Sequence, residues 1–318
     1  MTSTPSPWDW TPPGPCLLEQ PVSLLRFNGP DALRVLHGQT SQDLQSARPG
    51  DWHSTCCLTP TARPRGLAEV LVDDGGAWLA LTAGDGAAQR LAFDRVLVPP
   101  YHVVLGPFRT GRWWRGVGPP PAPAGTWRPL AGGGGWWLGP DLVALDGTPL
   151  PEALAALPRL TAAEAERWRL RQGEPAWPAE LNDAFNAFEL GLADRVSLSK
   201  GCYVGQETLA KLASGDGVKQ QLRRWWQVPD SPLAPPLEPG AALRTAAGTR
   251  AGQITSRLSL DDQTSVGLAM VRRQALGEEL LWAAAGDAWV PVRLSRPEAF
   301  QDPPPPPPSG LGRRTAVA

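Results

Sequence analysis

A short loop near residue 200 places a cysteine beside a lysine, between two glycines and ahead of an amphipathic stretch. Residues 197–213 read Ser-Leu-Ser-Lys-Gly-Cys-Tyr-Val-Gly-Gln-Glu-Thr-Leu-Ala-Lys-Leu-Ala. The spacing of Leu209 and Leu212 predicts one apolar face of a short helix. Cys202 would then lie just before a helix N-terminus, and both that position and the neighbouring Lys200 favour thiolate over thiol. The pattern is that of a reactive cysteine.

The same residues also fit a structural interpretation. A free cysteine often acts as a small buried apolar side chain. In that case Gly205 and Gln206 form a turn, and Glu207 is a carboxylate at the start of a helix, where the helix dipole favours negative charge. The residue types in this loop leave both interpretations open.

The remaining cysteines argue against metal or disulfide chemistry. Cys16, Cys56 and Cys57 form no Cys-x-x-Cys pair and have no histidines at zinc-binding spacing. Adjacent residues in a strand point to opposite faces, so Cys56 and Cys57 are poor ligands for one ion. We expect no metal site, reduced thiols and a cytoplasmic location.

Composition excludes several classes of partner. Lys and Arg number 30 against 31 Asp and Glu, so no overall field attracts nucleic acid or anionic lipid. Arg-flanked tryptophan pairs such as Trp113-Trp114 could stack on bases, but no RNA-binding motif accompanies them, and packing explains them better. No apolar run reaches the roughly 18 residues of a membrane span. We expect a soluble monomer that makes no direct contact with nucleic acid or membrane.

Periodicity in the first half predicts mixed helices and antiparallel strands. An apolar run follows Cys16, and Asp31 is placed to cap a helix that ends at Gly38. Strands are expected at 54–59, 67–72 and 78–82, the last two forming a hairpin, followed by a helix at 87–97. Residues 116–135, rich in Pro and Gly, read as a surface loop.

The second half changes in character at about residue 221. Strands at 136–138 and 142–145 and helices at 152–157 and 162–172 come first, with Gly173 as a helix cap. Six short strands separated by turns then predict a small antiparallel barrel: 222–228, 241–244, 251–256, 266–271, 280–283 and 290–294. The fold class is therefore α+β. We divide the chain into a disordered tail (1–15), an α+β domain (16–220), a barrel (221–298) and a Pro-rich disordered tail (299–318).

Residues 200–207, Lys-Gly-Cys-Tyr-Val-Gly-Gln-Glu, resemble the signature loop of the YgfZ family. Further similarity lies in residues 36–43, Leu-His-Gly-Gln-Thr-Ser-Gln-Asp, in residues 169–175, Arg-Leu-Arg-Gln-Gly-Glu-Pro, and in the barrel segments 252–256 and 267–271. The family shares its fold with the glycine-cleavage T-protein. The resemblance implies ferredoxin-like subdomains around a central folate channel, with a small C-terminal barrel.

The resemblance also implies a function. It indicates a protein that binds tetrahydrofolate or a derivative and supports the assembly or maintenance of iron–sulfur clusters, and through client enzymes tRNA modification. Cys202 would be the functional thiol. The other signature-loop residues would be Lys200, Gly201, Tyr203, Gly205, Gln206 and Glu207.

The folate-binding residues that the resemblance implies include one departure. Many relatives have a carboxylate two residues before the glycine at 173, where it can accept hydrogen bonds from a pterin, whereas this chain has Arg171. A guanidinium cannot accept those bonds. Either another carboxylate takes the role, or the pterin binds more weakly or in another orientation, or Arg171 meets a folate's glutamyl tail. The carboxylates and cations considered for the channel are Arg63, Glu69, Arg171, Glu180, Glu189 and Glu207, with Asp43 as a further candidate.

Two other functions fit the same sequence. One is a tetrahydrofolate-dependent aminomethyltransferase or demethylase, although the acidic pair of the T-protein is reduced here to Glu69, which weakens the case for a positioned acid or base. The other is an interaction module that retains the fold but neither the ligand nor the thiol chemistry. Whether the protein is an enzyme is left open by the sequence.

Overall fold

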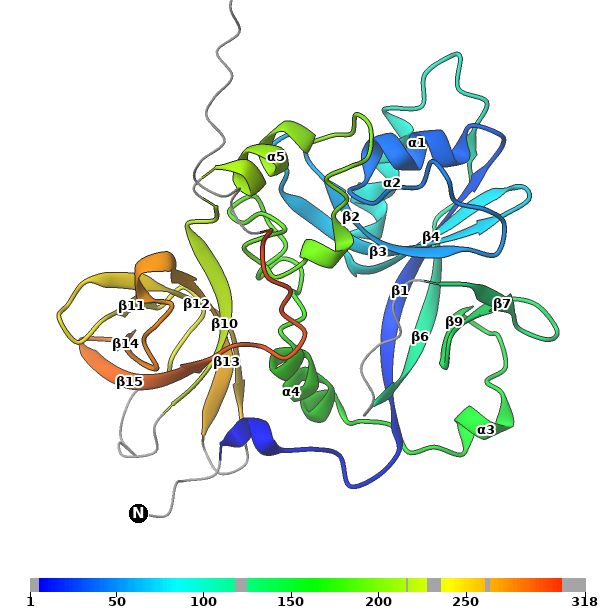
Figure 1. Ribbon diagram of the computed structural model, residues 1–318. Helices are drawn as coiled ribbons and strands as arrows, with labels where there is room; N and C mark the ends of the chain where they lie inside the picture. The colour runs from blue at the N-terminus through cyan, green and yellow to red at the C-terminus, as the bar shows by residue number, and fades with distance from the viewer. Residues whose placement is uncertain (1–5, 118–124, 216, 228–235, 261–263, 305–318) are drawn as a thin grey trace, which may run out of the picture.

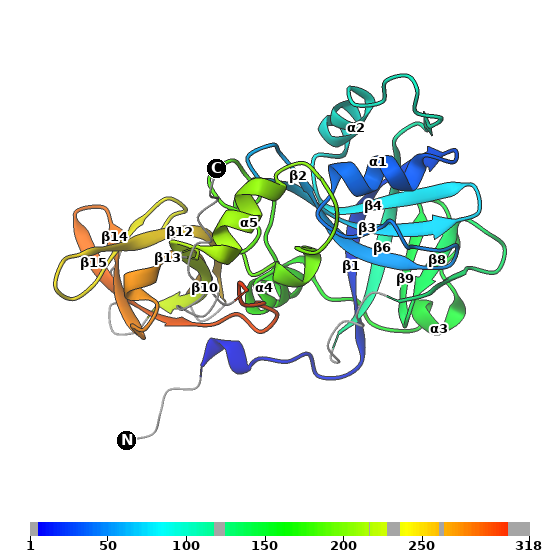
Figure 2. The same cartoon turned by 45° about the horizontal axis from the view of Figure 1, so that its top comes forward.

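The computed structural model describes residues 6–117, 125–215, 217–227, 236–260 and 264–304. A large sheet with its helices forms one side of the molecule and a barrel forms the other, with helix α4 (Ala162–Gln172) between them (Figures 1 and 2). None of the helices in the described ranges is long and apolar enough to cross a membrane.

The large sheet is built around two long antiparallel strands, β1 (Cys16–Asn28) and β6 (Arg109–Val117). Its order is β2-β3-β4-β1-β6-β9-β8-β7, with β5 paired to β1, and its pairs are antiparallel. The other strands are β2 (Trp52–Leu58), β3 (Pro64–Asp73), β4 (Gly76–Gly84), β5 (Val104–Leu105), β7 (Trp127–Pro129), β8 (Gly135–Leu138) and β9 (Asp141–Leu145).

Helices α1 (Ala32–Gln39) and α2 (Gly86–Asp94) belong to a buried apolar core with this sheet. Phe27 of β1 meets Phe93 of α2 edge to face, with ring centroids 5.0 Å apart, a geometry that aromatic pairs prefer. Cys57 lies in this core, whereas Cys56 lies in the cluster that faces the barrel side. The two adjacent thiols thus point to opposite faces of β2, as their position in a strand predicts.

Most predicted elements of this part are confirmed, including the β3–β4 hairpin and helix α4. That helix begins with a capping box of Thr161 and Glu164 and ends at Gly173, whose φ is 77°. Two details differ. Asp31 does not cap α1, because its carboxylate accepts a hydrogen bond from the backbone N–H of His102 at 2.9 Å. The segment 116–135, predicted as a surface loop, contains β7, whose residues pair with β8.

Helix α3 (Glu152–Ala155) precedes α4, and α5 (Gln206–Ser214) precedes the barrel. Between α4 and α5 runs a stretch of 173–205 that contains only one short 3₁₀ turn, η2 (Ala193–Arg195). We call it the connecting segment. Several of its apolar side chains, including Leu181, Phe185 and Leu190, are buried in one cluster with residues of the sheet and the barrel.

The C-terminal strands form the closed barrel that the sequence predicts, in the order β10-β13-β12-β11-β14-β15. Trp225 is fully buried, and its indole Nε1 donates to the Leu268 carbonyl at 3.0 Å. Closure removes the exposed edges of a small sheet. The strands are β10 (Gln220–Gln227), β11 (Ala242–Arg244), β12 (Arg250–Ser259), β13 (Ser265–Arg272), β14 (Leu280–Ala285) and β15 (Ala288–Ser295), with a 3₁₀ turn, η3 (Arg273–Ala275), after β13.

Both expected tails are ordered where the structure describes them, contrary to the prediction. Residues 7–9 form a capped 3₁₀ turn, η1 (Pro7–Asp9), in which Trp8 is 3% exposed and lies against the guanidinium of Arg224. At the other end Phe300 is buried, and the N–H of Gln301 donates to the Gly191 carbonyl. Buried aromatic surface and cation–π contacts stabilise both segments. Residues 1–5 and 305–318 of these tails lie outside the described residues.

Gly267→Ala should destabilise the barrel by about 3 kcal/mol or more, because a Cβ there would lie 1.9 Å from the Ser256 carbonyl oxygen. Gly277→Ala is the control, since nothing lies within 4 Å of the added Cβ, and it should change stability by less than about 0.5 kcal/mol. Urea unfolding measures both. Equal midpoints for the two variants would contradict the packing of β12 on β13.

Candidate functional site

A cavity of about 1440 Å³ lies between the large sheet, α4 and the connecting segment. The sheet contributes side chains such as Gln20, Glu69 and Trp113, and α4 contributes Trp168 and Arg171. Aromatic rings and charged groups therefore line the same space. Its volume exceeds that of typical small-molecule pockets, so an extended ligand of several rings fits.

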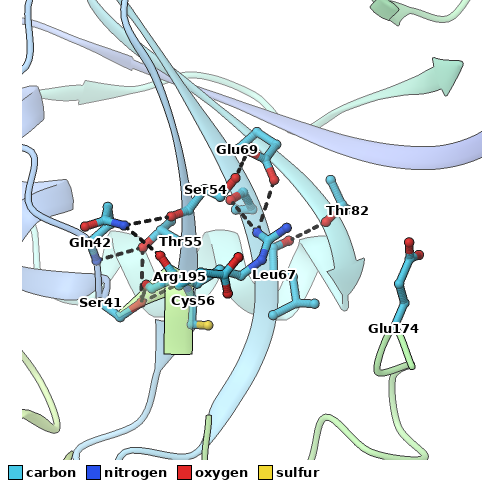
Figure 3. A network of polar contacts seen from close by, with 12 residues as sticks. Ser41, Gln42, Ser54, Thr55, Cys56, Leu67, Glu69, Thr82, Glu174 and Arg195 are labelled. Atoms are coloured by element: carbon cyan, nitrogen blue, oxygen red, sulfur yellow. Dashed lines mark hydrogen bonds and ion pairs between the residues drawn. The ribbon is translucent and has the colours of Figure 1, made fainter. Parts of the chain in front are cut away.

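The floor of the cavity contains a buried ion pair (Figure 3). Glu69 of β3 is fully buried, and its two oxygens accept from Arg195 Nη1 at 3.1 Å and from Ser54 Oγ at 2.6 Å. Burial alone would lower the pKa of Arg195, but Glu69 and other acidic neighbours raise it overall. Both charges are thus compensated inside the protein.

The backbone of Arg195 is fixed as firmly as its side chain. Ser41 Oγ donates to the Arg195 carbonyl at 2.6 Å and accepts from the N–H of Cys56 at 2.9 Å. The 3₁₀ turn η2 is therefore joined to β2 and β3 at once (Figure 3). The arrangement fixes one wall of the cavity through a single arginine.

A second ion pair links β6 to the connecting segment. Arg115 donates two hydrogen bonds to Glu174, both at 2.8 Å, the bidentate geometry that gives arginine pairs their specificity. Burial tends to raise the pKa of Glu174, but Arg115 lowers it overall. Both residues line the cavity, so this pair ties the start of the connecting segment to the sheet.

Arg171 lies in the cavity wall, but its charge is already paired. Its Nε donates to Glu298 at 2.6 Å and its Nη1 donates to the Trp10 carbonyl at 2.6 Å. Glu298 also accepts from Gln172 at 2.8 Å. Arg171 therefore holds the two terminal segments against α4.

The structure places only some of the predicted folate-binding residues in the cavity wall. Glu69 and Arg171 line the cavity, whereas Arg63, Glu180 and Glu189 are outside its wall. Glu180 accepts from Ser256 Oγ at 2.6 Å and from the N–H of Ala176. Glu189 accepts from the N–H of Asn186 and lies 3.8 Å from Arg63, and burial raises its pKa. The contacts of Glu180 and Glu189 are with the protein itself.

The lysine of the signature loop is buried and turned toward the sheet. Lys200 is 4% exposed, and its Nζ donates to the carbonyls of His37, Thr40 and Gln42 at 2.6 to 2.8 Å. Burial lowers the pKa of Lys200 to about 7, while three carbonyl acceptors favour the ammonium form. Its ammonium holds the connection between α1 and β2, so the expectation that this group assists the Cys202 thiolate is not supported.

Cys202 is exposed, whereas the other three cysteines are buried. This decides against the interpretation of Cys202 as a buried apolar residue. Burial raises the pKa of Cys56 to about 12, so that thiol is inert by comparison. Helix α5 begins only at Gln206, so its N-terminus lies four residues beyond the thiol rather than immediately next to it.

The rest of the signature loop shapes the backbone around Cys202. Gly205 has a φ of 80°, and a Cβ there would lie within about 3 Å of Ala62 backbone atoms. Tyr203 is buried, and its hydroxyl donates to the Ser197 carbonyl. A Cβ at Gly201 would lie 3.9 Å from His37 Nε2. Glu207 is exposed and accepts a hydrogen bond from Lys211. None of the loop residues 200–207 lines the cavity.

Several charged residues of the cavity wall are not predicted from the sequence, among them Arg115, Asp141, Glu174 and Arg195. Glu174 lies in the Gly-Glu-Pro of residues 173–175, a segment that carries the family resemblance but to which the sequence assigns no role in binding. Arg115 follows Trp113 by two residues in β6, so both side chains point to the same face of the sheet. This spacing is the signal in the sequence that could have identified Arg115. The residues that complete the cavity wall come from distant segments, which the spacing does not predict.

Three comparisons bear on the identity of the chain. Residues 218–302 match the family described as the CAF17 C-terminal beta-barrel domain. A chloroplastic protein of Arabidopsis thaliana, named as a transferase, is 40% identical over 111 residues, which are 35% of this chain and 24% of that protein. The chain thus spans about a quarter of the length of that relative.

The third comparison concerns the fold. The crystal structure of the glycine cleavage system aminomethyltransferase T from Bartonella henselae superposes with a TM-score of 0.69. The match covers 91% of this chain and 87% of that one at 14% sequence identity. It confirms the predicted T-protein-like α+β fold with its C-terminal barrel.

Replacing Arg195 with methionine should destabilise the protein by about 3 kcal/mol or more, because Glu69 would remain buried without its partner. The double variant with Glu69→Gln should recover most of that loss. Arg65→Met is the control, since its pair with Asp183 is exposed and contributes at most about 1 kcal/mol. Denaturant titrations give the four free energies, and equal losses for Arg195→Met and Arg65→Met would contradict the role of the buried pair.

Proposed function

We propose that this YgfZ-like protein binds a reduced folate in its central cavity and supports the assembly or maintenance of iron–sulfur clusters in client enzymes. The cavity of about 1440 Å³ inside a T-protein-like fold carries the proposal. Its position, between the large sheet and α4, gives a flat ring system access to apolar and hydrogen-bonding walls together.

The residues of the cavity suit a folate. Trp113 and Trp168 offer ring surfaces, on which a heterocycle can stack. Gln20 Oε1 and Trp113 Nε1 are buried atoms without a hydrogen-bond partner in the described structure, so the wall has unused capacity for a polar ring edge. A reduced folate would supply nitrogen atoms that carry one-carbon groups.

The exposed thiol of Cys202 supports a second activity outside the cavity. A single cysteine cannot hold a four-ligand cluster alone, so we infer transient contact or redox exchange with a client or its cluster. Any effect on tRNA modification follows through such clients. Four free cysteines suit a reducing compartment such as the cytoplasm.

An aminomethyltransferase or demethylase is the alternative, favoured by the fold shared with the Bartonella henselae enzyme. Glu69, the carboxylate in the position of the T-protein acidic pair, accepts from Ser54 and Arg195. A carboxylate with both oxygens occupied is a poor general base. Steady turnover of a folate one-carbon adduct would favour the enzyme over the accessory protein, and loss of both folate binding and thiol dependence would favour an interaction module.

Tetrahydrofolate should bind the wild-type protein in the micromolar range by calorimetry. Arg171→Glu restores the carboxylate of the relatives but places it near Glu298, so it should retain or improve binding only if the pterin edge reaches this position. Arg34→Glu, whose side chain is 70% exposed on α1, should bind as the wild type does. Binding by Arg171→Glu but not by the wild type would mean that this chain has lost its folate site.

Cys202→Ser should lower the activity of a radical-type iron–sulfur enzyme in cells, because it removes the one exposed thiol while leaving a side chain of similar size. Ser199→Ala, an exposed change in the same loop, is the control and should leave client activity unchanged. Folate affinity of the purified Cys202→Ser protein should equal that of the wild type. Full client activity in the Cys202→Ser strain would refute the thiol role without affecting the folate proposal.

A further inference from the structure

Three neighbouring strands present a polar surface to the cavity from the sheet side. Gln20 of β1 is the cross-strand partner of Trp113 of β6, and Leu18 is the partner of Arg115. Cross-strand partners share a face of the sheet, so these side chains lie together. On the next strand, β9, Asp141 is two residues before Val143, the partner of Trp113, and therefore points to the same face.

Asp141 differs from three other carboxylates of the cavity wall, each of which forms an ion pair with an arginine. Glu69, Glu174 and Glu298 are each within 3.1 Å of an arginine nitrogen. Asp141 is 9% exposed, and within the described part of the chain it has no ion-pair partner; its Oδ1 accepts from the N–H of Gly116 at 3.1 Å. The other carboxylate oxygen, Oδ2, has no hydrogen-bond partner among the described residues, at a buried position in the wall.

Three further atoms on this surface lack hydrogen-bond partners among the described residues: Gln20 Oε1, Trp113 Nε1 and Arg115 Nε. All three atoms are buried, although Gln20 Nε2 donates to the Thr82 carbonyl at 2.8 Å. Buried polar atoms are nearly always hydrogen-bonded, so such atoms beside a cavity point to a ligand or water as the missing partner. Acceptors on Asp141 and Gln20 flank a donor on Trp113.

We propose that Asp141 and Trp113 recognise the polar edge of the ligand's heterocycle. Asp141 accepts from ring N–H or amino groups, and the Trp113 indole donates to a ring carbonyl or nitrogen. The ligand class is a neutral heterocycle with donors next to acceptors, as in a pterin. This assignment rests on the proposed folate function and identifies the residues that confer its specificity.

The charge state of Asp141 gives the proposal a pH signature. Burial raises the pKa of Asp141 to about 6, while the Gly116 N–H and Arg115 lower it and Glu69 raises it further. Arg115 is itself paired with Glu174. Ring donors bind the carboxylate and not the acid, so affinity should increase as pH rises through about 6. From pH 5 to pH 8 the ionised fraction rises about tenfold.

Calorimetry with 5-formyltetrahydrofolate at pH 5 and pH 8 tests the assignment. Wild type should bind about tenfold more tightly at pH 8. Asp141→Asn keeps an oxygen that can accept from the Gly116 N–H, so the variant should fold. At pH 8 it should bind the ligand at least about tenfold more weakly than wild type does, and its affinity should be the same at both pH values. Titration of the ligand's own carboxylates is common to both proteins and cancels.

Trp113→Phe and Asp183→Asn complete the set. Trp113→Phe keeps an aromatic ring but removes the donor, so it should weaken binding at both pH values and retain the pH dependence. Asp183 is 76% exposed outside the cavity wall, and Asp183→Asn should match the wild type. If wild type binds no folate at either pH, the proposed function falls and the assignment with it. If wild type binds while Asp141→Asn and Trp113→Phe bind equally well, the assignment alone is overturned.

Discussion

The buried pair of Glu69 and Arg195 is the contact on which the organisation of the molecule depends. The connecting segment has almost no regular secondary structure, so backbone ladders cannot hold it in place. Its position comes instead from apolar burial and from charges anchored in the sheet, chiefly Arg195 on Glu69 and Glu174 on Arg115. Because a buried charge without its partner is costly, these pairs restrict the segment to one arrangement. The residues of both pairs also line the cavity.

The same segment carries the signature loop at its far end, which separates two kinds of chemistry. Lys200 holds the loop to the α1–β2 connection through three carbonyls, and Cys202 faces solvent. The cavity wall ends before the loop begins. A ligand in the cavity and a partner at the thiol would therefore meet one continuous piece of chain from opposite ends. Two contacts join the cavity wall to this part of the chain: Arg195 of η2, which donates to Glu69, and Gln42, which lines the cavity and whose carbonyl accepts from Lys200 of the loop.

Local signals determined how much the sequence could predict. The β3–β4 hairpin, the capped helix ending at Gly173 and the six barrel strands each carry their own periodicity or turn residues, and all are confirmed. The cavity residues carry no such signal. Arg195 meets Glu69 across more than 120 residues of chain, and Asp141 lies in the wall only because β9 pairs with β6. Glu69 and Arg171 were found because they stand at motif positions, whereas Glu180 and Glu189 stand at similar positions but bond to the protein.

The ordered terminal segments and the unusual Arg171 have a common explanation. An arginine introduced into the wall of a cavity must be compensated, and it donates here to Glu298 near the C-terminus and to the Trp10 carbonyl near the N-terminus. Composition alone marked both segments as tails, since Pro-rich stretches seldom form a core. Other contacts order these segments as well, including Trp8 against Arg224 and the N–H of Gln301 on the Gly191 carbonyl. A carboxylate at position 171 could not make the two Arg171 contacts, because a carboxylate accepts hydrogen bonds and cannot donate to a carbonyl. Arg171 thus links both terminal segments to the wall of the cavity.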